Sequence, residues 1–267
     1  MKLLAALAAT TALLCATSAS ADDSAVPKWS YRSNDGQSYG PSKWGSVGAA
    51  CDGKRQSPVD ITVKSVCDDG ERQSPLAFSG ECAAYKVQQV HDTFKAESAN
   101  GACQVAVKGK PYSFLQLHFH MPSEHTLNGK AMDAEVHFVH KAADGGLAVV
   151  GLFLEKDATA ETDPFIASFW KQVESASTNA TLNATLPSFH PAVRTSAGAG
   201  HLFNYPGSLT TPTCDEIVDW WVIEKPLKVS AAGMDKLRPF MERIKAADRG
   251  TNARPVQPLN GRQINVF

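Results

Sequence analysis

Two short apolar segments that each contain two histidines constrain the fold of this chain more than any other feature: 113–120 (SFLQLHFH) and 134–140 (AEVHFVH). Successive side chains of a β-strand point to opposite faces of its sheet, so residues two apart lie side by side. Each segment is therefore predicted to be a strand, and on each strand one face carries a candidate site histidine together with a polar residue. On the first strand that face carries Phe114, Gln116, His118 and His120, opposite Leu115, Leu117 and Phe119; on the second it carries Glu135, His137 and Val139, opposite Val136, Phe138 and His140.

The segment between these two strands contains Pro122 and the turn dipeptide Asn128-Gly129. Such a connection allows the strands to be antiparallel neighbours, which would bring His118, His120 and His137 to one point. Three neutral imidazoles suit zinc and leave its fourth tetrahedral position open. Because neutral ligands leave the full charge on the ion, water bound there becomes acidic near neutral pH. By composition His140 could replace His137, but it lies on the face opposite Glu135.

Polar residues stand two positions before two of these histidines and on the same face: Gln116 before His118, and Glu135 before His137. They are placed to bind the ring nitrogens that do not face the metal, which fixes the orientation of a ligand. His125 follows Pro122 in the connecting segment, and we interpret it as a hydrogen-bonded structural histidine in a loop.

The rest of the chain predicts one mainly β (α+β) domain, built on a large, mostly antiparallel central sheet with short peripheral helices. Strand-like runs dominate, and further examples are 147–154 and 218–226. A helix is expected over 163–176, with Asp163 as its cap and a proline in its first turn. A second is expected over 230–246, where Pro239 would kink it or end it early.

The N-terminus is predicted to be a secretory signal over residues 1–21, leaving a mature domain of 22–267. The alternative, a membrane anchor, is disfavoured because the apolar run is too short to span a bilayer comfortably. We therefore expect an exported protein in a secreted, extracellular or similar compartment, with no membrane partner. The formal net charge of -1 gives no indication of a nucleic-acid partner.

Export also changes how the cysteines are interpreted, because disulfides form in oxidising compartments. Five cysteines follow the signal, so at least one is free or joins another chain: Cys51, Cys67, Cys82, Cys103 and Cys214. Two glycosylation sequons, at Asn179 and Asn183, indicate a surface segment and a glycoprotein if the host glycosylates.

Segment 116–140 (QLHFHMPSEHTLNGKAMDAEVHFVH) closely resembles the zinc-site block of the alpha-class carbonic anhydrases. Residues 205–212 (YPGSLTTP) resemble the threonine loop of that family, and 56–61 (QSPVDI) and 252–264 (NARPVQPLNGRQI) resemble two further family segments. The resemblance runs from Trp29 almost to the C-terminus. It implies a zinc hydro-lyase that hydrates carbon dioxide reversibly to bicarbonate and a proton, through a zinc-bound hydroxide.

The resemblance also implies roles for individual residues. Thr210 matches the residue that accepts a hydrogen bond from the zinc hydroxide, and Glu124 matches the carboxylate that receives the proton of that threonine. The backbone of Thr211 is placed to orient an anion. Inhibition by anions and sulfonamides is expected. The zinc ligands of the family correspond to His118, His120 and His137, its partners of these ligands to Gln116 and Glu135, and its apolar carbon dioxide pocket to Val139, Val149 and Leu209.

Three further matches concern proton transfer and cross-linking. His91 lies where the family has its proton-shuttle histidine, although the local sequence Gln-Val-His departs from the frequent Asn-Gly-His. Tyr31 resembles the tyrosine that holds the water chain. Cys51 and Cys214 match the disulfide of exported members, whereas the partners of the other cysteines stay open, as does the oligomeric state.

Two alternatives from other classes are less consistent with the sequence. A silent binding module on the same scaffold would be expected to lack a ligand histidine, and none is missing. A zinc protease is disfavoured because the chain has no His-Glu-x-x-His helix and its candidate ligands lie on strands.

Overall fold

The computed structural model describes residues 29–33, 36–62, 74–176 and 180–267. The predicted signal over 1–21, Cys67 and Asn179 lie outside the described residues, so these predictions are not tested. Within the described part of the chain, no helix is long and apolar enough to cross a membrane.

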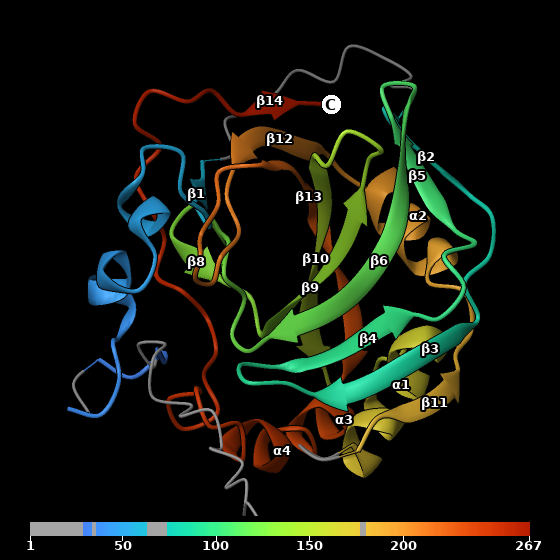
Figure 1. Cartoon of the computed structure of the whole chain (residues 1–267). Coiled ribbons are helices and arrows are strands. Elements are labelled where there is room, and N and C mark those ends of the chain that lie inside the picture. Colours follow the sequence, from blue (N-terminus) through green and yellow to red (C-terminus); the bar gives the residue numbers. More distant parts are fainter. Residues whose placement is uncertain (1–28, 34–35, 63–73, 177–179) are drawn as a thin grey trace, which may run out of the picture.

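One large sheet of eleven strands forms the body of the molecule (Figure 1). Antiparallel pairs dominate, but β10 and β13 pair in parallel, so the sheet is mixed. The mostly antiparallel β fold with few short helices is confirmed. In spatial order the main path is β11 (Leu182–Thr185), β3 (Ala84–Gln89), β4 (Phe94–Ser98), β6 (Lys110–His120), β9 (Ala134–Lys141), β10 (Leu147–Asp157), β13 (Val218–Ser230), β12 (Leu202–Gly207) and β14 (Asn265–Val266).

Smaller elements complete the fold. Strand β5 (Gln104–Val107) pairs with β6 and with the edge strand β2 (Leu76–Ser79). A separate three-stranded sheet consists of β1 (Asp60–Ile61), β7 (Thr126–Leu127) and β8 (Lys130–Ala131). Two 3-10 helices, η1 (Pro41–Ser46) and η2 (Ala49–Asp52), precede β1.

The observed helices agree in part with those predicted from the sequence. Helix α1 (Pro164–Ser175) begins at its predicted cap, because the Asp163 side chain accepts a hydrogen bond from the amide of Phe165. The second predicted helix is interrupted as its proline suggested, and forms α3 (Ala231–Asp235) and α4 (Arg238–Glu242). Helix α2 (His190–Gly198) was not predicted.

The register of β6 and β9 decides which side chains share a face. The strands are antiparallel, and His118 lies directly opposite His137. A β-bulge between Phe114 and Gln116 shifts the alternation of β6. The prediction that Phe114 shares the histidine face, with Leu115 on the apolar face, is therefore wrong: Phe114 is buried in the main core and Leu115 is exposed.

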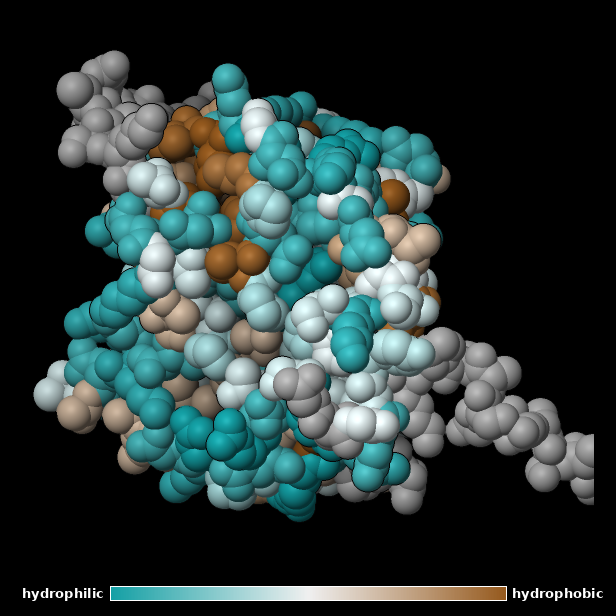
Figure 2. All heavy atoms as spheres, turned by 90° about the vertical axis from the view of Figure 1, so that its left-hand side faces the viewer, coloured by the Kyte–Doolittle hydropathy of each residue, from teal (hydrophilic) through white to brown (hydrophobic). Residues whose placement is uncertain are grey.

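The sheet has an apolar core on each face. The larger core contains Phe138 and the buried face of α1, including Phe165 and Phe169. The smaller one contains Val139 and Trp220, on the face that bears the histidines. Figure 2, which shows the left-hand side of Figure 1, presents mostly hydrophilic side chains with apolar ones gathered in its upper part.

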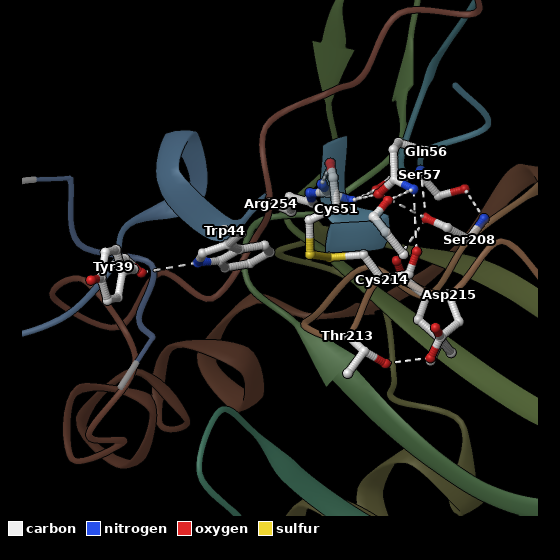
Figure 3. The surroundings of a disulfide bond; sticks show 12 residues. Tyr39, Trp44, Cys51, Gln56, Ser57, Ser208, Thr213, Cys214, Asp215 and Arg254 are labelled. Atoms are coloured by element: carbon white, nitrogen blue, oxygen red, sulfur yellow. Dashed lines mark hydrogen bonds between the residues drawn. A yellow bond between two sulfur atoms is a disulfide. The ribbon is translucent and has the colours of Figure 1, made fainter. Parts of the chain in front are cut away.

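Two disulfides are present among the described residues. One joins Cys51 to Cys214, the pair implied by the family resemblance. The other joins Cys82 to Cys103, a pairing that the sequence left open. Figure 3 shows the first disulfide beside Arg254, whose guanidinium donates to the carbonyl oxygens of Cys51 and Ser57. This buried cluster holds the loop before β13 against the segment around η2.

Candidate active site

Three histidine rings converge on the face of the sheet that carries the smaller core. His118 and His120 project from β6, and His137 projects from β9. Their ring centroids lie 4.7 to 5.2 Å apart. One nitrogen of each ring lies within 4.8 Å of the corresponding nitrogen of the others. This separation allows all three to reach one ion.

In each ring the other nitrogen faces an oxygen acceptor, hydrogen-bonded in His118 and His120 and in close contact in His137. His118 Nδ1–H donates to Gln116 Oε1 at 2.9 Å, and His120 Nδ1–H donates to the Asn252 carbonyl oxygen at 2.7 Å. His137 Nε2 lies 3.0 Å from Glu135 Oε1. Because an engaged N–H leaves a lone pair on the opposite nitrogen, the free atoms are Nε2 of His118, Nε2 of His120 and Nδ1 of His137.

Burial keeps these rings neutral. It lowers the pKa of His118 well below its ordinary value, and it lowers the pKa of His120 and His137 as well. Among the described residues, His120 Nε2 is buried without a hydrogen-bond partner. Three neutral nitrogen donors, one of them an orphaned buried atom, fit a zinc ion.

Glu135 connects His137 to the surrounding loop. Its Oε2 accepts from the amides of Glu124 at 3.0 Å and His125 at 2.9 Å, and its Oε1 accepts from His125 Nδ1–H at 2.8 Å. The second contact of Oε1, with His137, is short, although only the His125 contact has good hydrogen-bond geometry. Burial would raise the pKa of Glu135, but the two histidines outweigh it and lower the pKa well below its usual value.

His125 has the structural position expected for it. It lies in the loop before β7, buried, with Nε2 2.6 Å from the hydroxyl of Tyr205. The Tyr205 hydroxyl in turn donates to Ser57 Oγ at 3.0 Å. The chain of contacts from His137 therefore ends in the loop before β1.

Glu124 faces the histidines from the same loop. The amide of Arg254 donates to its Oε1 at 2.9 Å, while its Oε2 lies 3.4 Å from His120 Nε2. Burial raises the pKa of Glu124 to about 7, against a hydrogen bond from Thr210 that lowers it. A cation held by the histidines would also oppose this rise, favouring a carboxylate that accepts the Thr210 proton.

A cavity of about 300 Å³ opens beside the histidines. Larger hollows elsewhere in the described structure contain none of these three rings. Two unpredicted charged residues, Asp92 and Lys95, line the cavity, and Lys95 pairs with Glu97 at 2.7 Å. The predicted site residues that line it are His91, Gln116, His118, His137, Val139, Val149, Leu209, Thr210 and Thr211.

Of the two residues expected to serve proton transfer, His91 lines this cavity, whereas Tyr31 is not among the lining residues. His91 is exposed at the edge of the cavity, and its Nε2–H donates to the Trp29 carbonyl oxygen at 2.9 Å. Tyr31 is buried against Trp29 and Trp44. Within the described part of the chain its hydroxyl has no hydrogen-bond partner.

Sequence reasoning missed two residues that hold the histidines. Asn252 positions His120 through a backbone carbonyl, a group every residue has, so its side-chain type gave no signal. Trp220 packs edge-on against His137 and His125, with ring centroids 4.8 Å from each. Trp220 lies in the strand-like run 218–226, which was the sequence signal that could have led to it. In the structure it pairs with Val149, a predicted residue of the pocket.

Fold and site together define a β protein with a three-histidine centre, two of its rings buried and one half-buried, beside a small, partly apolar cavity. The family model for eukaryotic-type carbonic anhydrase matches residues 39–267. Carbonic anhydrase 7 of Mus musculus is 32% identical over 267 residues, covering 89% of this chain and 96% of its own length. A carbonic anhydrase of Pectobacterium carotovorum is 30% identical over 258 residues, covering 92% and 93%.

Comparison with solved structures points to the same family. The alpha-carbonic anhydrase of Thermovibrio ammonificans in complex with the inhibitor sulfanilamide superposes with a TM-score of 0.72 at 31% identity, covering 89% of this chain and 98% of that one. The chain therefore belongs to the eukaryotic-type carbonic anhydrase family, and this membership supports an enzyme that hydrates carbon dioxide.

Proposed function

We propose that this enzyme hydrates carbon dioxide reversibly to bicarbonate and a proton with zinc held by His118, His120 and His137. The observation that carries the proposal is the set of three neutral rings whose free nitrogens face one point beside the cavity. Zinc bound there would supply a concentrated positive charge that lowers the pKa of a water molecule toward neutrality. Gln116, Glu135 and the Asn252 carbonyl would hold the ligands in orientation.

The walls of the cavity suit an apolar substrate and a directed nucleophile. Val139, Val149 and Leu209 provide a surface on which carbon dioxide can rest without losing hydrogen bonds. If Thr210 donates its proton to Glu124, its oxygen can only accept from the attacking hydroxyl. That arrangement would direct a lone pair of the nucleophile toward the substrate. The backbone beside Thr211 would orient the anionic product.

Each turnover leaves a proton to be exported from the buried site. The exposed ring of His91, at the cavity edge, is placed to pass it to solvent. An imidazole titrates near neutral pH, which suits both acceptance and release. The hydroxyl of Tyr31, which has no hydrogen-bond partner among the residues that the structure describes, is available to hold water on the path.

Small-molecule inhibitors that present a deprotonated nitrogen or another anion would compete at the same centre. The complex of the Thermovibrio ammonificans enzyme with sulfanilamide supports this part of the proposal. We expect sulfonamides to bind this chain with zinc present and to lose affinity when zinc is removed.

Stopped-flow hydration of carbon dioxide, with metal analysis on the same sample, tests the function. Zinc-loaded protein should hydrate carbon dioxide rapidly and lose this activity on chelation. No acceleration by protein that carries a full complement of zinc would favour the alternative, a silent binding module. Mutation of the ligands then separates metal binding from catalysis.

We also propose export directed by residues 1–21, with a glycan on the mature chain if the host glycosylates. Asn183 is exposed on β11, which pairs with β3 and lies at one end of the strand order of the large sheet. N-terminal sequencing of the secreted protein should begin after Ala21. Mass analysis before and after deglycosylation should show a shift that Asn183→Gln reduces.

A further inference from the structure

A glycine on β10 lies beside the carboxylate that orients His137. Gly151 is buried in the middle of the sheet, paired with His137 on β9 and with Val222 on β13. Its backbone is not in the left-handed region that favours glycine. A glycine inside a strand weakens it, and often marks a place where another group approaches closely. What requires glycine at this position is therefore space.

The space is occupied by Glu135. A Cβ atom added at Gly151 would lie 2.7 Å from Glu135 Oε1 and 3.8 Å from its Cδ, closer to the oxygen than real Cβ atoms come. The next nearest atom, Val222 Cγ2, would be at an ordinary contact distance of 3.6 Å. The conflict is thus specific to one oxygen of one side chain.

That oxygen has little freedom to move away. Glu135 is fully buried, and its two oxygens accept from the amides of Glu124 and His125 and from His125 Nδ1–H, while Oε1 also lies 3.0 Å from His137 Nε2. Displacing Oε1 would lengthen its contacts with both imidazoles. Because a buried carboxylate that loses donors is costly, neighbouring backbone and rings would shift with it.

We propose that Gly151 is a positioning residue of the metal centre: its missing side chain leaves the volume through which Glu135 reaches His137 and His125 together. A methyl group at this position would disturb the orientation of His137 without touching any ligand. The metal-binding consequence depends on the proposed zinc site, whereas the displacement of Glu135 does not.

The variant Gly151→Ala tests this inference, and Gly198→Ala is its matched control. A Cβ added at Gly198, in α2, would meet nothing within 4 Å, and this residue lies outside the site, so it undergoes the same chemical change without a clash. Imidazole N–H protons bonded to a buried carboxylate give resolved downfield NMR signals. We expect the His125 and His137 signals to shift or broaden in Gly151→Ala and to stay unchanged in Gly198→Ala.

Chelator competition gives the second readout. Loss of a group that orients a metal ligand typically weakens metal binding by about 10- to 100-fold, and we expect Gly151→Ala to fall in this range. Unchanged NMR signals together with unchanged zinc affinity would overturn the inference. If the wild-type protein bound no zinc, the proposed function would fail, while the NMR comparison would still test the geometry.

A double-mutant cycle with Glu135→Asp separates this clash from general weakening of β10. The shorter side chain withdraws the carboxylate, so Gly151→Ala should reduce zinc affinity by a smaller factor in that background. Equal factors in both backgrounds would contradict the inference. If Gly151→Ala alone does not fold, the double variant should fold; its failure in a background where Glu135→Asp folds would also contradict it.

Discussion

Acid should destabilise this protein through a histidine that takes no part in the proposed chemistry. His140 is fully buried on the core side of β9, against the rings of Phe114 and Phe189. Its Nδ1–H donates to the Phe138 carbonyl oxygen at 2.9 Å, and its Nε2 has no partner among the described residues. Burial lowers the pKa of His140 from 6.5 to about 3.

Proton linkage determines the direction in which the free energy of unfolding changes with pH. Between these two pKa values the unfolded chain binds a proton at His140 and the folded chain does not, so the free energy of unfolding rises with pH. The stability is fully present above the unfolded pKa and is lost progressively as pH falls toward the folded one. At about pH 5 the loss amounts to about 2 kcal/mol, from 1.36 kcal/mol per pKa unit.

Urea unfolding of the wild type and His140→Asn at about pH 8 and about pH 5 measures this loss. The asparagine amide can replace the Nδ1 donor but does not titrate. The variant is expected to be less stable at both pH values, because it leaves a cavity. Its loss between the two pH values should be smaller than that of the wild type by about 2 kcal/mol.

The other titrating groups are present in both proteins. Among them is His190 near the same core, whose pKa is lowered to about 4 by burial and by the charge of Arg194. Release of zinc in acid is common to both as well. Equal losses in the two proteins would refute the reasoning, because they would mean that His140 is not held neutral by the fold.

Two further predictions concern the proposed chemistry. Thr210→Val keeps the shape of the side chain and removes its hydroxyl, and we expect kcat/KM for hydration to fall by about 100-fold or more with zinc content unchanged; an unaltered kcat/KM would reject the role of this hydroxyl. His91→Ala should lower kcat by up to about 100-fold in weak buffer with kcat/KM nearly unchanged, and added imidazole should restore it. If kcat in weak buffer were unaffected both by His91→Ala and by added imidazole, the proposed shuttle role of His91 would be rejected.

The strand pattern predicted the pairing of the two histidine segments because alternation is a local property of the backbone. It failed at Phe114 and Leu115, where the bulge in β6 inserts one residue and reverses the phase. Neither residue carries a sign of the bulge, since both are apolar. The pairing around the bulge is set by neighbouring strands that are distant in the sequence.

The partners of the site were predictable only where a side chain makes the contact. Gln116 and Glu135 can be identified by type and spacing, whereas the carbonyl of Asn252 cannot. The Cys82–Cys103 disulfide also could not be deduced, because it depends on how the edge strand β2 folds back on β5. The role proposed for Gly151 could not be predicted from the sequence for a related reason, because it depends on the absence of a side chain.

The proposed chemistry depends on the three converging rings holding a metal ion, and equilibrium dialysis against zinc followed by elemental analysis tests this directly. Wild-type protein should retain an equimolar amount of zinc, and His118→Ala should lose most of it. His201→Ala is the matched control, because His201 pairs with Glu224 away from the site, and it should retain zinc in full. Wild-type protein without zinc, or His118→Ala with undiminished zinc, would contradict the account.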